Sequence, residues 1–286
     1  MKYFLYSSQL AAFIGRNPHN NACRVFNKLY EKYFTDAIKS YKLEKEMQER
    51  NVGDTAKLQN ISNKIGDKKL LIKIDDMCKR NLSTTNLQKE RNDLLKQLET
   101  KLDEEDKKEI EKAMVGYTNK KFGTIREVNA LDIYKEKFNC NVITKIQQRS
   151  KKILEINGNE LWLISRLDGM KMDGTVVEIK NRIYRLFEEV REYEWMQVQA
   201  YLQVYGLPKA ELVEYLNCGK GEMKVNMIEK DDKYWEDVLK KELQYYFNVF
   251  LGLVGNEKKM KKYMILGETE QNEMIKKMVR KEKKKL

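Results

Sequence analysis

The sequence predicts a mixed α/β fold, with a mixed central sheet flanked by helices and a charged helical insertion. Short alternating apolar segments between residues 141 and 180 are separated by Asn-Gly and Asp-Gly pairs, a pattern typical of strands joined by tight turns. Apolar residues at helical spacing over 124–138 and 187–205 indicate helices before and after these strands. The stretch 36–112 is dense in Lys, Glu, Asp and Gln, which favours long amphipathic helices inserted into the core.

The expected order of elements begins with a short helix from Ser8, a turn at 15–18 and a second helix from near Asn21. Helix, strands, helix and strand then alternate, which indicates an α/β core. We expect an antiparallel meander followed by a helix that ends at Gly206, one further strand, and a helix beyond Lys233 with an apolar stripe. The strands are expected over 141–146, 152–156, 160–168, 175–180 and 210–216.

These elements predict three parts of the chain. Residues 1–35 and 113–255 form the expected core, and 36–112 form the insertion, as solvated helices or as an arm for DNA or a partner. Residues 256–286 form a basic C-terminal helix or tail, most simply a frayed and solvated one.

The charge of the chain favours a polyanionic partner. It has 56 Lys and Arg against 44 Asp and Glu, a formal net charge of +12, so nucleic acid and an anionic membrane surface both remain open. A membrane span needs roughly 18 consecutive apolar residues, and the richest apolar run here, 247–254, is far shorter. We therefore expect a soluble protein.

The cysteine and histidine content excludes several chemistries. The four cysteines are far apart and form no CxxC pair, which argues against a zinc or iron–sulfur site and fits a reducing, intracellular compartment. His19 is the only histidine, so a Ser/His/Asp triad has no base available elsewhere. Catalysis would have to come from carboxylates and lysines.

The most informative segment runs from Asp168 to Lys180. Side chains alternate along a strand, so Glu178 and Lys180 share one face, and the preceding hairpin brings Asp168 beside Glu178. Two neighbouring carboxylates repel unless a cation lies between them, and Mg²⁺ or Mn²⁺ suits such oxygen ligands. The alternative is a pair of hairpin turns beside a solvent-facing strand edge, and for Asp173 we prefer this turn interpretation.

Four motifs in order resemble the lambda-exonuclease or YqaJ-type viral recombinase branch of the PD-(D/E)xK nucleases. The outer ones are similar to the Ser-x-x-Ala and Ile-Gly-x-Asn-Pro opening, the Gly-Thr-x-x-Glu helix and the Gln-x-x-x-Tyr helix of that family, and the long charged insertion before Gly123 departs from its pattern. The matching segments are 8–19, 123–134, 168–180 and 197–201.

The resemblance implies roles for further residues. Glu127 would be an additional acidic group at the metal site. The structural alternative is that Thr124 and Glu127 form a capping box that begins a helix. The backbone carbonyl of Ile179 would be a further metal ligand. Gln197 would orient Lys180 or the substrate, and Tyr201 shares its helix face. Ser8 and Arg16 would lie near the DNA end, with a plain turn as the alternative.

The expected function is Mg²⁺-dependent or Mn²⁺-dependent hydrolysis of DNA, with Asp168, Glu178 and Lys180 at the centre of the site. The resemblance favours 5′-to-3′ digestion of duplex ends in viral recombination, with a single-strand annealing protein as partner and homo-oligomer formation left open. The alternatives are an endonuclease on the same core and a catalytically inactive DNA-binding protein.

Overall fold

The computed structural model describes residues 1–34, 54–79, 84–182, 185–216 and 221–284, apart from the side chains of residues 79, 84–85 and 119–126. Residues 36–53 of the expected insertion and Cys218 lie outside this description. Cys23, Cys78 and Cys140 are free thiols. None of the helices in the described ranges is long and apolar enough to cross a membrane.

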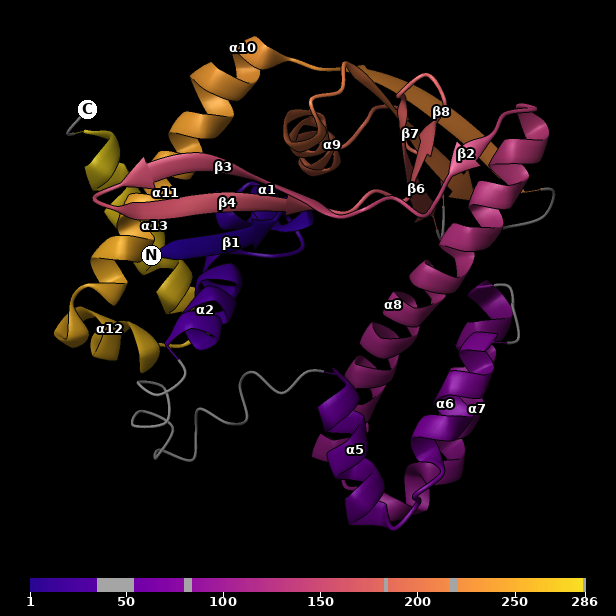
Figure 1. Ribbon diagram of the computed structural model, residues 1–286. Coiled ribbons are helices and arrows are strands. Elements are labelled where there is room, and N and C mark those ends of the chain that lie inside the picture. The colour runs from indigo at the N-terminus through magenta and orange to yellow at the C-terminus, as the bar shows by residue number, and fades with distance from the viewer. Residues whose placement is uncertain (35–53, 80–83, 183–184, 217–220, 285–286) are drawn as a thin grey trace.

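The mixed α/β class is confirmed, and the strands form two mixed sheets (Figure 1). The first has the order β1-β4-β3, in which β1 is parallel and β3 antiparallel to β4. The second has the order β2-β5-β6-β7-β8, in which only β6 and β7 are parallel. The strands are β1 Lys2–Tyr6, β2 Val142–Ile143, β3 Arg149–Ile156, β4 Asn159–Ser165, β5 Gly169–Lys171, β6 Val176–Arg182, β7 Lys209–Leu216 and β8 Glu222–Glu229.

The expected single meander is wrong, because its strands are divided between the two sheets. Strand β4 ends at Ser165, and the short link 166–168 carries the chain to β5 in the second sheet. The partners of β4 are β3 on one side and the N-terminal strand β1 on the other. Strand pairing of this kind depends on a segment about 160 residues away, which local periodicity does not reveal.

Helix α9 connects the two sheets. It contacts β3 and β4 of the first sheet and β7 of the second, and it ends at Gly206 in the left-handed conformation, as expected. The opening helices η1 and α1 also pack against it. The helices of this part are η1 Ser7–Gln9, α1 Leu10–Phe13, α2 Ala22–Tyr33, α9 Glu192–Tyr205, α10 Asp232–Tyr234, the π-helical η3 Trp235–Leu239 and α11 Lys240–Val254.

Helix α8 (Glu104–Lys137) joins the sheets to a separate group of helices (Figure 1). Its first half packs on α5 (Asp54–Ile65), α6 (Leu70–Lys79) and α7 (Thr84–Leu98), and η2 (Glu99–Lys101) connects α7 to α8. These helices enclose their own apolar cluster, which includes Leu58, Ile74, Leu94 and Met114. The insertion therefore contains a small core, and α8 runs through the expected boundary at residue 112.

The helix that we expected to begin at Thr124 begins twenty residues earlier. Asp103 caps α8 by accepting a hydrogen bond from the backbone N–H of Asp106 at 2.8 Å, and the helix continues without a break to Lys137. Thr124 lies inside it. A capping box operates only where backbone N–H groups are unpaired at a helix start, so this alternative for Glu127 is wrong.

The expectation of a frayed tail is wrong as well. Residues 257–283 form α12 (Glu257–Met264) and α13 (Glu268–Lys283), and α13 packs on α2 and α11. Ile275 and Val279 are buried there, one helical turn apart. The lysine-rich composition indicated a solvated segment, but the lysines lie on the face of the helix opposite to a buried apolar stripe.

The packing of α13 leads to a stability prediction. Ile275→Ala is expected to lower the free energy of unfolding by about 2–5 kcal/mol, because it removes a fully buried side chain and leaves a cavity. Urea unfolding followed by circular dichroism measures the change. The matched control is Lys277→Ala on the exposed side of the same helix, and equal stability of the two variants would show that α13 does not belong to the core.

Candidate active site

Strand β6 carries the central residues of the candidate site. It lies between β5 and β7, so the alternative of a solvent-facing strand edge is wrong. Glu178 and Lys180 point to the face of the sheet covered by α9, and Glu178 is only 3% exposed. Val177 and Ile179 point to the other face, where they pack against α8. The acid and the lysine are therefore enclosed between the sheet and a helix.

Asp168 lies beside Glu178, as the hairpin predicted. Its Oδ2 accepts a hydrogen bond from the backbone N–H of Ile179 at 2.9 Å. The next residue, Gly169, pairs with Val177 in the β5–β6 hairpin, and a Cβ at position 169 would collide with the side chain of Val142 on β2. Only glycine fits there. The close approach of β2 thus restricts the backbone at residues 168–169 and, with it, the position of the Asp168 side chain beside β6.

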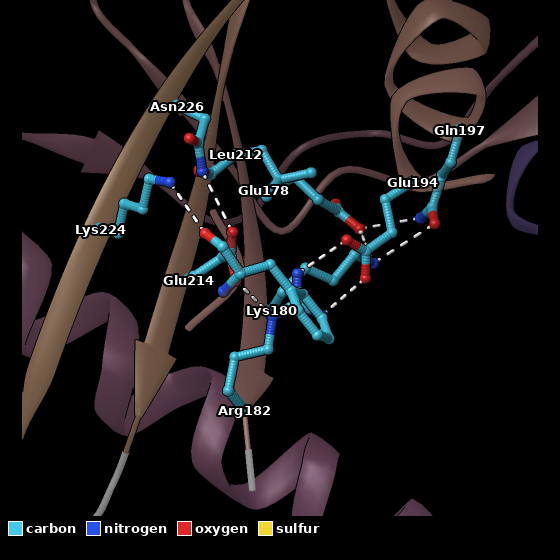
Figure 2. A network of polar contacts seen from close by, with 10 residues as sticks. Glu178, Lys180, Arg182, Glu194, Gln197, Leu212, Glu214, Lys224 and Asn226 are labelled. Atoms are coloured by element: carbon cyan, nitrogen blue, oxygen red, sulfur yellow. Dashed lines mark hydrogen bonds and ion pairs between the residues drawn. The ribbon is translucent and has the colours of Figure 1, made fainter. Parts of the chain in front are cut away.

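The two oxygens of Glu178 have different surroundings (Figure 2). Oε1 accepts hydrogen bonds from Lys180 Nζ at 2.7 Å and from Gln197 Nε2 at 2.8 Å. Oε2 is buried and has no hydrogen-bond partner among the described residues. Burial is the main cause that raises the pKa of Glu178 to about 8; Lys180 opposes the shift and Asp168 adds to it. A buried carboxylate oxygen without a partner is costly, so this oxygen is suited to a cation.

Lys180 and Gln197 complete the contacts of this group. Burial opposes the charge of Lys180, but the neighbouring Glu178 carboxylate outweighs it and leaves the pKa of Lys180 raised. Lys180 Nζ donates to Gln197 Oε1 at 3.3 Å, and Gln197 Nε2 donates to the hydroxyl of Tyr201. Gln197 and Tyr201 therefore share one face of α9 as the i, i+4 spacing predicted. Tyr201 is buried, and its contact with DNA stays a prediction.

Glu127 lies on α8, close enough to Asp168 and Lys180 for their charges to affect its pKa. Burial and the negative charge of Asp168 raise the pKa of Glu127 to about 7, while Lys180 and Arg166 act in the opposite direction. These electrostatic effects place Glu127 within range of Asp168 and Lys180. The structure thus brings together Asp168, Glu178 and Lys180 through their contacts, and Glu127 is linked to them only through the effect of their charges.

The donors present fit a divalent cation of the Mg²⁺ type. Asp168 and the free Oε2 of Glu178 are hard oxygen ligands, and Mg²⁺ is bound through one or two carboxylates and keeps several waters. Within the described residues no three His, Cys, Asp or Glu side chains form a group that could hold a metal ion by themselves. Ligation by Glu127 and by the backbone carbonyl of Ile179 stays a prediction.

The opening segment 7–16 packs against α9, and its polar side chains Ser7 and Arg16 contact other residues of the protein. Arg16 donates to Glu192 Oε1 at 2.9 Å in the first turn of α9 and to the hydroxyl of Tyr234 at 3.2 Å. Ser8 is exposed in η1, whereas its neighbour Ser7 is buried against Ser165. Ser8 caps no helix, because η1 begins at Ser7. Contacts of Ser8 and Arg16 with DNA stay predictions, and Glu192 already neutralises part of the charge of Arg16.

Comparison with known proteins gives weak matches only. No protein-family model matches the chain, and no curated protein matches its sequence. Among solved structures, it is similar to an alkaline exonuclease (LHK-Exo) from Laribacter hongkongensis, with a TM-score of 0.37 and 17% identity over 46% of this chain and 67% of that one. A structure of LHK-Exo in complex with dAMP matches with a TM-score of 0.32 and 18% identity over 57% and 73% of the two chains.

A third solved structure, described as that of SSO0001, matches with a TM-score of 0.37 and 17% identity. The match covers 46% of this chain and 60% of that one, so it extends over less than two thirds of SSO0001. At these values the likenesses assign no activity to this chain, and its function has to be inferred from its own residues.

Sequence reasoning missed three charged residues next to the site. Arg182 on β6, Glu194 on α9 and Glu214 on β7 form a buried group joined by ion pairs of 2.7 Å (Figure 2). The alternation that places Glu178 and Lys180 on one face also places Arg182 there, and this signal was available. Glu214 lies in an apolar strand whose two faces are both covered, so its burial could have been inferred only from the packing.

Proposed function

We propose that this protein is a metal-dependent DNA nuclease whose active site is built on Asp168, Glu178 and Lys180. The observation that supports it most is the buried Glu178 carboxylate. One of its oxygens is bound by Lys180 and Gln197, and the other has no hydrogen-bond partner within the described part of the chain. Asp168 lies next to this carboxylate, where it accepts from the backbone N–H of Ile179. The chain's net charge of +12 favours a polyanionic substrate.

The residues divide the work of hydrolysis between them. Asp168 and Glu178 would hold a divalent ion, Mg²⁺ or Mn²⁺, with Glu127 and the carbonyl of Ile179 as further candidate ligands. Such an ion supplies Lewis-acid activation of water and of the phosphate. Lys180 offers an ammonium group that orients the attacking water and stabilises negative charge that develops on the phosphate. Gln197 holds the carboxylate of Glu178 and the ammonium of Lys180 in fixed relative positions.

The finer proposal is a 5′-to-3′ exonuclease that acts on duplex DNA ends in viral recombination, in a reducing intracellular compartment. It rests on the four ordered motifs that resemble the lambda-exonuclease or YqaJ-type family. A single-strand annealing protein as partner and a homo-oligomeric assembly belong to the same resemblance. The second candidate is an endonuclease on the same core, and the third is a catalytically inactive DNA-binding protein, against which the pairing of Lys180 with Glu178 beside Asp168 argues.

Cleavage of linear and closed-circular DNA tests the function and its type. The protein is incubated with a linear duplex labelled at either the 5′ or the 3′ end, and with covalently closed plasmid, in Mg²⁺ and in EDTA. We expect Mg²⁺-dependent loss of the 5′ label from the linear duplex and no nicking of the plasmid. Nicking of the circle would establish an endonuclease. No cleavage of either DNA in Mg²⁺ or Mn²⁺, with retained binding, would leave the inactive DNA-binding protein.

A further inference from the structure

A buried ion cluster continues the active-site face of β6 two residues beyond Lys180 (Figure 2). The Arg182 guanidinium donates from Nη1 and Nη2 to the two oxygens of Glu194, both at 2.7 Å, and from Nε to Glu214 Oε2 at 2.7 Å. The side chains of Arg182, Glu194 and Glu214 are 9%, 4% and 0% exposed. A guanidinium held by a bidentate contact with one carboxylate and a further hydrogen bond to another is fixed in a single orientation.

The cluster joins the elements on which the active site depends. Glu194 lies in the first turn of α9, three residues before Gln197, so the two side chains occupy neighbouring positions on one helix face. Glu214 belongs to β7 and also accepts a hydrogen bond from the backbone N–H of Phe187, at 3.0 Å, in the segment that leads into α9. The helix start itself has no side-chain cap at Arg191. The contact with Arg182 therefore attaches the first turn of α9 to the sheet.

Stability alone does not account for this cluster. Removing charges from water costs free energy, and well-packed apolar side chains of similar volume are often equally or more stabilising than a buried ion pair. The cluster differs from apolar packing in its fixed geometry. Both oxygens of Glu194 accept hydrogen bonds from Arg182. The charge of Glu194 also acts on the ammonium group of Lys180. Without Arg182, Glu194 would compete with Glu178 for Lys180.

We propose that Arg182 is a positioning residue of the active site. By holding Glu194, it fixes α9 on the sheet so that Gln197 keeps the Glu178 carboxylate and the Lys180 ammonium in place. The kinetic consequence of this proposal rests on the proposed nuclease function, whereas its geometric consequence does not.

A double-mutant cycle tests the kinetic consequence. Arg182→Lys keeps the positive charge but loses the bidentate contact with Glu194. We expect kcat to fall about tenfold with KM nearly unchanged, because small displacements of catalytic groups slow the chemical step. In a Gln197→Ala background the same change is expected to lower kcat by less than about twofold, since the group that Arg182 positions is already absent. An equal factor in both backgrounds would overturn the proposal.

A matched control makes the same chemical change away from the site. Arg24 Nε contacts Glu268 Oε1 at 2.8 Å between α2 and α13, so Arg24→Lys also loses an arginine–carboxylate contact. We expect its kcat to equal that of the wild type. A fall equal to that of Arg182→Lys would reject a specific positioning role. Should Arg182→Lys not fold, Glu194→Gln takes its place in the cycle, because it keeps the shape and removes one acceptor.

Nuclear magnetic resonance tests the geometric consequence without requiring activity. The side-chain amide signal of Gln197, assigned by its loss in Gln197→Ala, reports on the contacts with Glu178 and Tyr201. We expect it to shift in Arg182→Lys and to stay in place in Arg24→Lys. An unchanged signal in Arg182→Lys would overturn the proposal. If the wild type shows no metal-dependent cleavage but Arg182→Lys still shifts the Gln197 signal, the proposed function is rejected and the positioning of Gln197 by Arg182 is retained.

Discussion

Lys180→Ala is expected to abolish DNA cleavage while DNA binding stays close to that of the wild type. The substitution removes the only ammonium group that contacts Glu178 among the described residues. Loss of one group that stabilises charge in the transition state costs roughly 10²–10³-fold in kcat, and in the proposed mechanism the same group also orients the attacking water. Binding changes little, because one basic residue of 56 is lost.

Single-turnover cleavage of a labelled duplex and binding of the same duplex in Ca²⁺ or EDTA measure the two effects separately. Folding of the variant is checked by its melting temperature, since Glu178 loses one of its two hydrogen-bond donors when Lys180 is shortened. Lys171→Ala is an informative comparison, because Lys171 also pairs with a buried glutamate, Glu211, at 2.6 Å, but on β5 and β7 away from Gln197. Turnover of Lys180→Ala within a few-fold of the wild type would reject its assignment.

Glu178→Gln is expected to eliminate both cleavage and stabilisation by Mg²⁺. The amide keeps the shape of the side chain but lacks the negative charge that a divalent ion requires. A ligand that binds only the folded state stabilises it by about 2.7 kcal/mol when its free concentration is a hundred times Kd, so the wild type should melt at a higher temperature in Mg²⁺ than in EDTA. The variant should melt at the same temperature in both.

In EDTA the substitution relieves the burial of the Glu178 charge but leaves the buried Lys180 ammonium without its carboxylate partner, so the response to Mg²⁺, and not the stability in EDTA, is the result that decides. Asp173→Asn is the matched control. Asp173 lies in the same hairpin but is half exposed, accepts from the backbone N–H of Thr175 and pairs with Lys209, so this variant should keep the full response to Mg²⁺. An unchanged response in Glu178→Gln would place the metal elsewhere, around Asp173 or Glu127.

The sequence alone predicted the parts of the site that depend on local geometry. The alternation of a strand places Glu178 and Lys180 on one face whatever surrounds them, and a hairpin of a few residues returns Asp168 to Glu178. The helical period likewise places Gln197 and Tyr201 together. The mixed α/β class and the helical character of the 36–112 segment, within its described residues, follow from the same short-range periodicities.

Only the tertiary structure decided which of these local units meet. The division of the strands between two sheets, the packing of α13 on α2, and the reach of Glu127 to Asp168 all join segments far apart in the chain. Periodicity indicates that a face is apolar or charged, but the partner of that face is set by packing. The contact of Arg182 with Glu194 and Glu214 shows this most clearly, because the three charges are stable in the interior only when β6, β7 and α9 bring them together.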